Sequence, residues 1–333
     1  MAAITAALVV AVIGVANVRA APSPSLPPVP ADQLLASTLS ALAQPFTISG
    51  DARTHLDLGI PELPTSIGGS TGGAAAALAL VTGDQRFRVW RSPDGVRVAH
   101  LLDFREQDLV ANHHEAWLWD SQTMTAVHAT YPPVSANAPL APAGDVTAIA
   151  TRLLTAIAPY ADVTVDGTAV VAGRPCYELV LTPRSTVTRI GRISAAIDAE
   201  TRLPLRFQIF ARGADAAAVE GGFTNVSFGP IDPAMFTFTP PPGATVKEST
   251  DLGSTAQGAT GPAPVSDMKV FGDGFDLRVA LRLDVSPPRQ ISAMLPYAGP
   301  LASAVLVDRG DHAWLLVGFV DVATLQKDAA ALT

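Results

Sequence analysis

Two adjacent histidines followed by a glutamate, His113, His114 and Glu115, are the residues that most suggest a metal site. Zinc needs three or four converging ligands, whereas adjacent residues of a strand point to opposite faces. The two histidines would share one ion only if a turn bent them together. We therefore expect a solvated turn, with Glu115 continuing into the next strand, and neither a metal nor another cofactor.

A second candidate is the stretch GGSTG at residues 68–72, which matches the nucleophile elbow of α/β-hydrolases. That motif works because a strand delivers its serine, here Ser70, to a strained turn before a helix. The preceding IPELPTSI contains two prolines, which are unfavourable in a central strand, and no alternating strands and helices follow. We expect a glycine-rich loop rather than an esterase, and its glycines would permit hinge motion over a cavity at 59–75.

Trp117 and Trp119 lie two residues apart on a predicted strand, so both project from the same face. They are either ordinary core packing against a helix or the wall of a pocket that accepts acyl chains. These alternatives overlap in a curved sheet, whose inner face is both core and pocket. The same argument adds lining residues from neighbouring strands and one helix: Phe87, Val89, Ile149, Leu153, Ile157, Phe207, Ile209 and Met235.

Composition narrows the possible partners. The 333 residues are 48% hydrophobic and 16% charged, with a formal net charge of −8. This balance disfavours a nucleic-acid partner, which would need a basic stripe. Arg86, Arg88 and Arg91 alternate with apolar residues and are expected on a solvated outer face. The single cysteine, Cys176, excludes an internal disulfide and is expected to be a small apolar strand residue.

The N-terminal residues predict export. MAAITAALVVAVIGVANV carries no charge before Arg19, and 18 helical residues would span about 27 Å. This length suits either a membrane anchor in residues 1–18 or the apolar part of a signal peptide cleaved after Ala20. The proline-rich residues 21–31 would form an extended spacer. We therefore expect an extracytoplasmic protein, secreted or held at the membrane.

Short strands account for most of the remaining chain. From Arg86 the apolar residues recur with period 2, and turns are predicted at 93–95, 166–167 and 198–201. Asp32 is expected to cap one helix, and a second is expected at 145–158. Few helices among many strands predict an α+β fold, in which a curved antiparallel sheet forms an open half-barrel with helices on its concave face.

The order of these elements resembles that of the LolA-type lipoprotein-carrier superfamily, and most closely its membrane-anchored actinobacterial members. The residues that bear the resemblance cover roughly 32–245, with a linker at 246–266 and a tail of two or three strands and a terminal helix at 267–333. They are FRVW (87–90), WLWDSQTMTAVH (117–128), VAGRPCYELVLTP (171–183), IDAETRLPLRFQIFARG (197–213) and FTNVSFGPIDPAMFTFTPPPGA (223–244).

The resemblance implies an apolar cavity, between the half-barrel and its helices, that holds the acyl chains of a lipid or lipoprotein without catalysis. The family pattern also has a tight hairpin turn at Asn112. A second group in the superfamily, the RseB-type regulators, implies an alternative function, an envelope sensor that docks an anti-sigma factor. The chain departs from the carriers because it lacks a lipidation cysteine and carries the extra tail.

Overall fold

The computed structural model describes residues 23–57, 83–131, 146–249, 265–284, 292 and 295–332, without the side chains of 146–150 and 265–266. The expected export segment, the loop with Ser70 and most of the expected linker lie outside these residues. Among the described residues, no helix is both long enough and apolar enough to cross a membrane.

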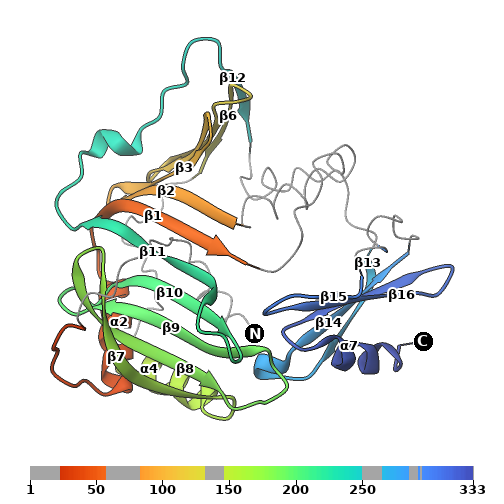
Figure 1. Ribbon diagram of the computed structural model, residues 1–333. Coiled ribbons are helices and arrows are strands. Elements are labelled where there is room, and N and C mark those ends of the chain that lie inside the picture. The colour runs from red at the N-terminus through yellow and green to blue at the C-terminus, as the bar shows by residue number, and fades with distance from the viewer. Residues whose placement is uncertain are drawn as a thin grey trace.

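A twelve-stranded sheet forms the larger part of the molecule (Figure 1). Its neighbouring strands are antiparallel except for β12, which pairs with β6 in parallel. The sheet is curved and does not close, so the expected α+β half-barrel is confirmed. In spatial order the strands are β12 (Thr245–Glu248), β6 (Thr125–Thr130), β5 (Glu115–Asp120), β4 (Arg105–Ala111), β3 (Gly95–Leu102), β2 (Gly83–Ser92), β1 (Ile48–Leu56), β11 (Ala217–Ser227), β10 (Pro204–Ala211), β9 (Ile190–Asp198), β8 (Arg174–Pro183) and β7 (Ala161–Val171).

Two helices, α2 (Ala31–Ala43) and α4 (Val146–Ile157), lie against one face of the β7 end of this sheet, which we call the helix-side face (Figure 1). Leu34 of α2 is fully buried against Tyr177 and Ile197, which are opposite one another on β8 and β9. Asp32 was expected to cap α2 but lies in its first turn, because the helix begins at Ala31 and its N-cap is Pro30.

The turns follow local sequence with one exception. The predicted turns at 93–95 and 198–201 are found, but the chain does not turn at Asp166 and Gly167. Gly167 has φ +91° and lies in an irregularity of β7 between Val165 and Thr168, where a bulge absorbs one extra residue. The turn into β8 comes at Ala172 and Gly173, both with positive φ.

A second sheet of five antiparallel strands follows the large one. Its order is β13 (Val265–Phe271), β14 (Arg278–Leu283), β17 (Ala313–Gly318), β16 (Ser303–Asp308) and β15 (Tyr297–Ala298). The helix α7 (Val322–Ala329) covers one face, where Trp314, Leu316 and Leu325 form a buried core. The tail thus contains more strands than expected, and residues 246–248 of the expected linker belong to β12.

The two sheets meet along the ends of β9, β10 and β11. Leu301 of the second sheet is buried with Ile190, Ala211 and Ala218 of the first. The Arg189 amide donates to the Phe319 carbonyl at 2.6 Å, and the Arg189 guanidinium donates to the Pro300 carbonyl at 3.1 Å. The interface therefore combines apolar burial with backbone hydrogen bonds.

Candidate functional site

The helix-side face continues beyond the helices across the centre of the large sheet. Phe207 of β10 is opposite Ala195 on one side and Gly221 on the other. Gly221 is opposite Thr54, and Thr54 is opposite Gln85, which lies two residues before Phe87 on β2. Because directly opposed residues share a face, Phe207 and Phe87 are on the helix-side face, as is Val89. All three are half-buried.

Trp117 and Trp119 lie on the opposite face. Leu118, between them, is opposite Leu109, which pairs with Val98, and Val98 pairs with Val89. The two indoles therefore share a face with each other, as predicted, but not with Phe87 and Val89. They lie 5.5 and 5.8 Å from the ring of Phe238. The five predicted lining residues on these strands, Phe87, Val89, Phe207, Trp117 and Trp119, are thus divided between two faces of the sheet.

The remaining predicted lining residues lie in three further places. Leu153 and Ile157 are half-buried on α4, which packs against α2 and β7. Ile209 is on the helix-side face, but it packs into the cluster that joins the two sheets. Met235 is half-buried in the short helix η2 (Pro233–Phe236). The side chain of Ile149 lies outside the described residues.

His113 and His114 lie in a turn, as expected. Asn112 caps this turn, since its side-chain oxygen accepts from the amides of His114 and Glu115 at 3.0 and 3.2 Å. Glu115 begins β5, and the imidazoles of His113 and His114 meet edge to face at 6.3 Å. In the part of the chain that the structure describes, no group of three or more His, Cys, Asp or Glu residues is arranged to hold a metal ion.

A different histidine is engaged on the face of the tryptophans. His128 of β6 stacks on Trp117, with ring centroids 4.0 Å apart and planes 15° apart. Its Nε2 lies 2.9 Å from a carboxylate oxygen of Glu115, and its Nδ1 lies 3.0 Å from one of Glu248. Burial lowers the pKa of His128, but the hydrogen bonds to Glu248 and Glu115 outweigh it, so the pKa is raised. We call these four residues the His128 cluster.

One contact of the His128 cluster, the stack of His128 on Trp117, could have been predicted from the sequence. The turn at 121–124 sets a register in which Trp117 must oppose His128, so the stacked pair follows from the hairpin. Glu248 was not predictable, because β12 reaches β6 as a parallel strand from far along the chain. No local pattern marks that pairing.

The predicted arginine face is only partly found. The side chains of Arg86 and Arg88 are more than half exposed and form ion pairs with Asp103 and Asp51. Arg91 is on the helix-side face, and its guanidinium lies 4.7 Å over the ring of Phe46. Burial lowers the pKa of Arg91, so the expectation of a solvated position was wrong for this residue. Because side chains alternate between the two faces along a strand, Arg91 shares a face with Phe87 and Val89, whereas Arg86 and Arg88 are on the other face.

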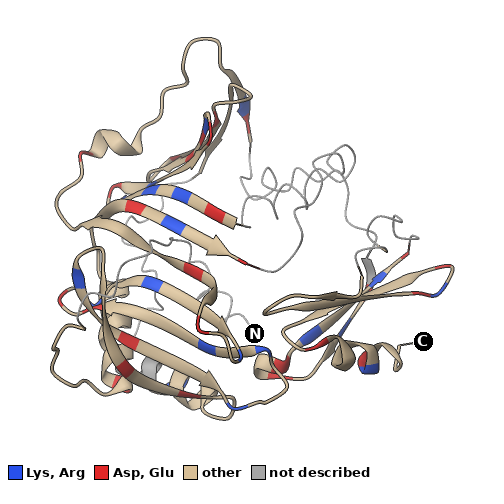
Figure 2. Cartoon of the chain, in the orientation of Figure 1, with Lys and Arg blue, Asp and Glu red and all other residues tan. Residues whose placement is uncertain are grey.

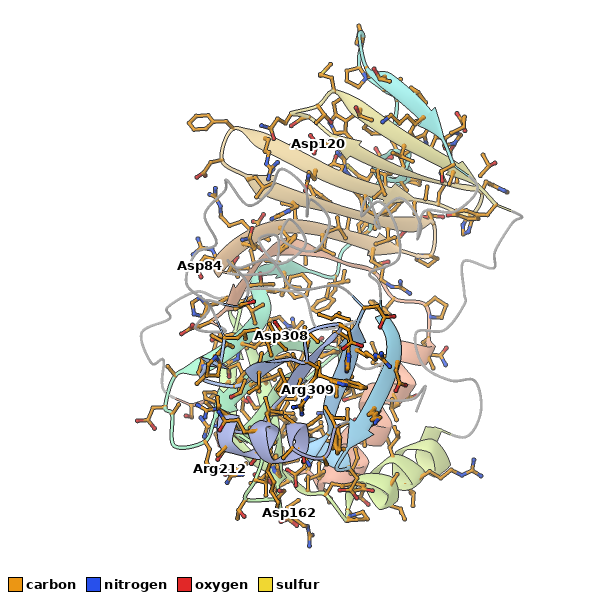
Figure 3. The ribbon with its side chains drawn as sticks, turned by 90° about the vertical axis from the view of Figure 1, so that its right-hand side faces the viewer. Asp84, Asp120, Asp162, Arg212, Asp308 and Arg309 are labelled. Carbon is orange, nitrogen blue, oxygen red and sulfur yellow. The ribbon has the colours of Figure 1, made fainter. Side chains whose placement is uncertain are left out.

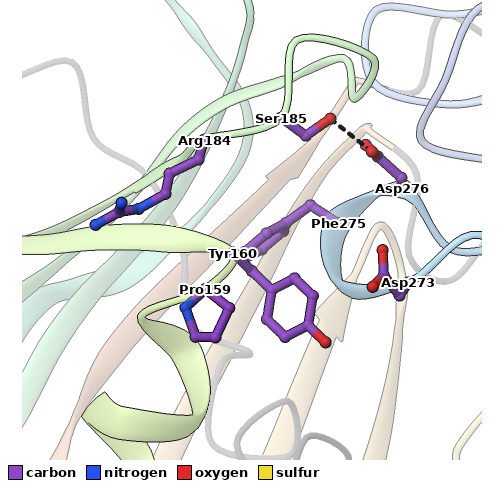
Figure 4. A pocket seen from close by; sticks show the side chains of 7 residues that line it. All are labelled: Pro159, Tyr160, Arg184, Ser185, Asp273, Phe275 and Asp276. Atoms are coloured by element: carbon purple, nitrogen blue, oxygen red, sulfur yellow. Dashed lines mark hydrogen bonds between the residues drawn. The ribbon is translucent and has the colours of Figure 1, made fainter.

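The hollows of the described surface include the following two. The first, of about 660 Å³, lies over β7–β10 on the face away from the helices, and Glu178, Ser194, Arg206 and Gln208 give it a polar floor. The second, of about 420 Å³, lies where the two sheets meet (Figure 4). There the Ser185 hydroxyl donates to Asp276 at 2.6 Å. Charged residues are spread over both sheets rather than gathered on one (Figure 2).

No family model matches the chain, and no curated protein matches it. Among solved structures it is similar to MucB in complex with MucA, at 16% identity and a TM-score of 0.45 over 89% of this chain and 96% of that one. The Pseudomonas aeruginosa MucA/MucB complex gives the same identity and coverage at a TM-score of 0.43. A LolA superfamily protein from Nitrosomonas europaea is 10% identical over 63% of this chain and 99% of that one, with a TM-score of 0.23. The fold class itself rests on the strand order in Figure 1.

Proposed function

We propose that this chain is an extracytoplasmic protein that binds the acyl chains of a lipid or lipoprotein without catalysing a reaction. The helix-side face carries the proposal. Beyond the part that α2 covers, it presents the half-buried side chains of Phe87, Val89 and Phe207 across four adjacent strands. An aromatic and aliphatic surface of this kind suits a flexible hydrocarbon, which needs no directional partner.

The energy of acyl burial suffices for this function. Each buried methylene contributes about 0.8 kcal/mol, so a chain of ~16 carbons offers at most ~12 kcal/mol before the cost of association. No reactive group is needed to explain binding of that strength. The membrane segment proposed for residues 1–18 would keep such a protein close to its source of lipid, and the domain proposed at 32–245 would carry the ligand.

Lipid extraction followed by mass spectrometry of the purified full chain tests the proposal. We expect acyl lipids to co-purify, and Phe207→Glu to reduce their amount, because a carboxylate on the helix-side face opposes hydrocarbon binding. Phe104→Glu is the matched control, since Phe104 is fully exposed at a turn. The absence of lipid from the wild-type chain, together with no binding of a fluorescent fatty acid, would contradict the proposal.

A second function is favoured by the face of the five-stranded sheet that α7 leaves uncovered. Met268 and Val270 on β13, and Val317 on β17, expose 60%, 46% and 36% of their surface there. Apolar side chains gathered on one face of a small sheet are typical of a docking surface. On this proposal the chain is an envelope-sensing regulator whose second sheet docks a membrane partner, such as the anti-sigma factor implied by the sequence resemblance.

Two variants distinguish the lipid-binding function from the docking function. Val317→Lys should abolish capture of the partner while leaving acyl lipid bound to the large sheet. Phe207→Glu should have the opposite effect. Loss of lipid in Val317→Lys would show that the second sheet belongs to the lipid site, and unchanged capture would exclude this face as the docking surface.

A further inference from the structure

β12 is an unusual edge strand. It has four residues, all of them exposed, and it is the parallel partner of β6 in a sheet whose other described pairs are antiparallel. Its ends are held by two backbone hydrogen bonds of 2.8 Å, from the Thr245 amide to the Met124 carbonyl and from the Ser249 amide to the His128 carbonyl. Little apolar burial supports this strand, so it is held by its backbone pairing with β6 and by side-chain contacts between the two strands.

The contact between His128 and Glu248 joins β12 to β6 directly. Nδ1 of His128 lies 3.0 and 3.2 Å from the two carboxylate oxygens of Glu248, while Nε2 faces Glu115 on β5. An ionised carboxylate can only accept hydrogen bonds, so both ring nitrogens must carry protons for both contacts to form. A neutral imidazole has one N–H, and its other nitrogen would face a carboxylate with no proton between them.

The two carboxylates beside His128 favour its charged form, and they outweigh the opposing effect of burial. Glu115 comes from β5 and Glu248 from β12, and Trp117 covers one face of the ring. The Tyr131 hydroxyl, at the end of β6, donates to backbone carbonyls of Asn112 and Glu115 rather than to the imidazole. Lys247 is opposite Val127, so its side chain lies on the other face of the sheet. No cation on these elements competes with His128 in the part of the chain that the structure describes.

We propose that β12 is a latch strand, which stays on the edge of β6 while His128 is protonated and separates from it when His128 becomes neutral. β12 is followed by the segment that leads to the second sheet, so its release would lengthen that connection. Release would also uncover the hydrogen-bonding edge of β6, which could then pair with another extended chain. The latch would make both events depend on the pH outside the cytoplasm.

The direction of the effect follows from the raised pKa of His128. A group whose pKa is higher in the attached state stabilises that state fully below its ordinary value of 6.5 and loses this contribution as the pH rises through the raised value. β12 should therefore be firmly attached at pH 5.5 and weakly attached at pH 8.5.

Hydrogen–deuterium exchange of the full chain at these two pH values tests the latch. After correction for the intrinsic pH dependence of exchange, protection of the Thr245 and Ser249 amides should be lower at pH 8.5 than at pH 5.5. Protection in β8 and β9 should not change. Glu248→Gln should remove the pH dependence at these amides; its side chain is 72% exposed, so the variant should fold.

His128→Gln should leave β12 weakly protected at both pH values. His55→Gln is the matched control, because His55 also pairs with a carboxylate across neighbouring strands, 2.9 Å from Asp84, but lies away from β12. Equal protection of β12 at pH 5.5 and 8.5 in the wild-type chain would overturn the proposal. Unaltered pH dependence in Glu248→Gln would overturn it as well.

Discussion

Asp198 is buried with no exposed side-chain surface, and Arg174 binds it with two parallel hydrogen bonds, from Nε at 2.7 Å and from Nη2 at 2.9 Å. The same carboxylate accepts from the amide and hydroxyl of Thr201 at 2.7 and 2.8 Å. It therefore fixes the turn between β9 and β10 and ties that turn to the start of β8.

Removal of this carboxylate should strongly destabilise the large sheet. In Asp198→Ala the Arg174 guanidinium loses its buried partner, and the loss of one partner of a buried pair costs about 3–5 kcal/mol of unfolding free energy. Chemical denaturation at pH 7 measures the change. Glu200→Ala is the control, because Glu200 also binds Arg174 but is 81% exposed, and it should have little effect.

The same carboxylate predicts sensitivity to acid. Burial raises the pKa of Asp198, but hydrogen bonds from Arg174 and Thr201 outweigh it, so the pKa is lowered from 3.8. A lowered pKa contributes stability above the ordinary value and loses it as the pH falls through the lowered value. Unfolding free energy should therefore drop below about pH 4 in the wild-type chain, and less steeply in Asp198→Asn. Equal slopes in the two proteins would contradict the assignment.

Cys176 should resist thiol reagents. Its side chain is fully buried, and burial, with the nearby Asp198 carboxylate, raises the pKa of the thiol to about 12. Almost no thiolate exists at pH 8, and the thiolate is the reactive form. Aromatic disulfide reagents should label the chain only after denaturation, which absorbance would follow. Rapid labelling of the folded protein at pH 8 would show that β7–β9 open readily.

The sequence predicted the strands well, because period 2 and local turn residues determine each hairpin. The two tryptophans share a face, and the histidine pair is a turn, for the same local reason. Seen from the side of the second sheet, Asp120 and Asp162 lie at opposite ends of the molecule (Figure 3), and no local pattern specifies that separation. The pairing of β1 with β11 and of β12 with β6 joins distant segments. The faces of Phe87 and Trp117 depend instead on the exact registers of three successive hairpins, which place Leu118 rather than Trp117 on the face of Val89.

Gly95 marks a close approach that only glycine permits. A Cβ at this position would lie 2.4 Å from the Ala111 carbonyl oxygen and 2.9 Å from the side chain of Phe236. Gly95→Ala should therefore force β3, β4 and the buried Phe236 apart and cost about 1–3 kcal/mol. Gly229→Ala is the matched control, since its nearest contact would be an ordinary 3.5 Å. Thermal unfolding of both variants measures the difference, and equal midpoints would rule out the close approach.

Leu301 should couple the unfolding of the two sheets. It is 1% exposed and packs against Ile190, Ala211 and Ala218 of the large sheet, so Leu301→Ala leaves a cavity at the interface. Such truncations cost about 2–5 kcal/mol. We expect one calorimetric transition in the wild-type chain and two in Leu301→Ala, with the second sheet unfolding first. Leu277→Ala, at a 40% exposed leucine in the same part of the chain, should retain one transition. If Leu301→Ala also unfolds in one step, the backbone hydrogen bonds at Arg189 suffice to hold the two sheets together.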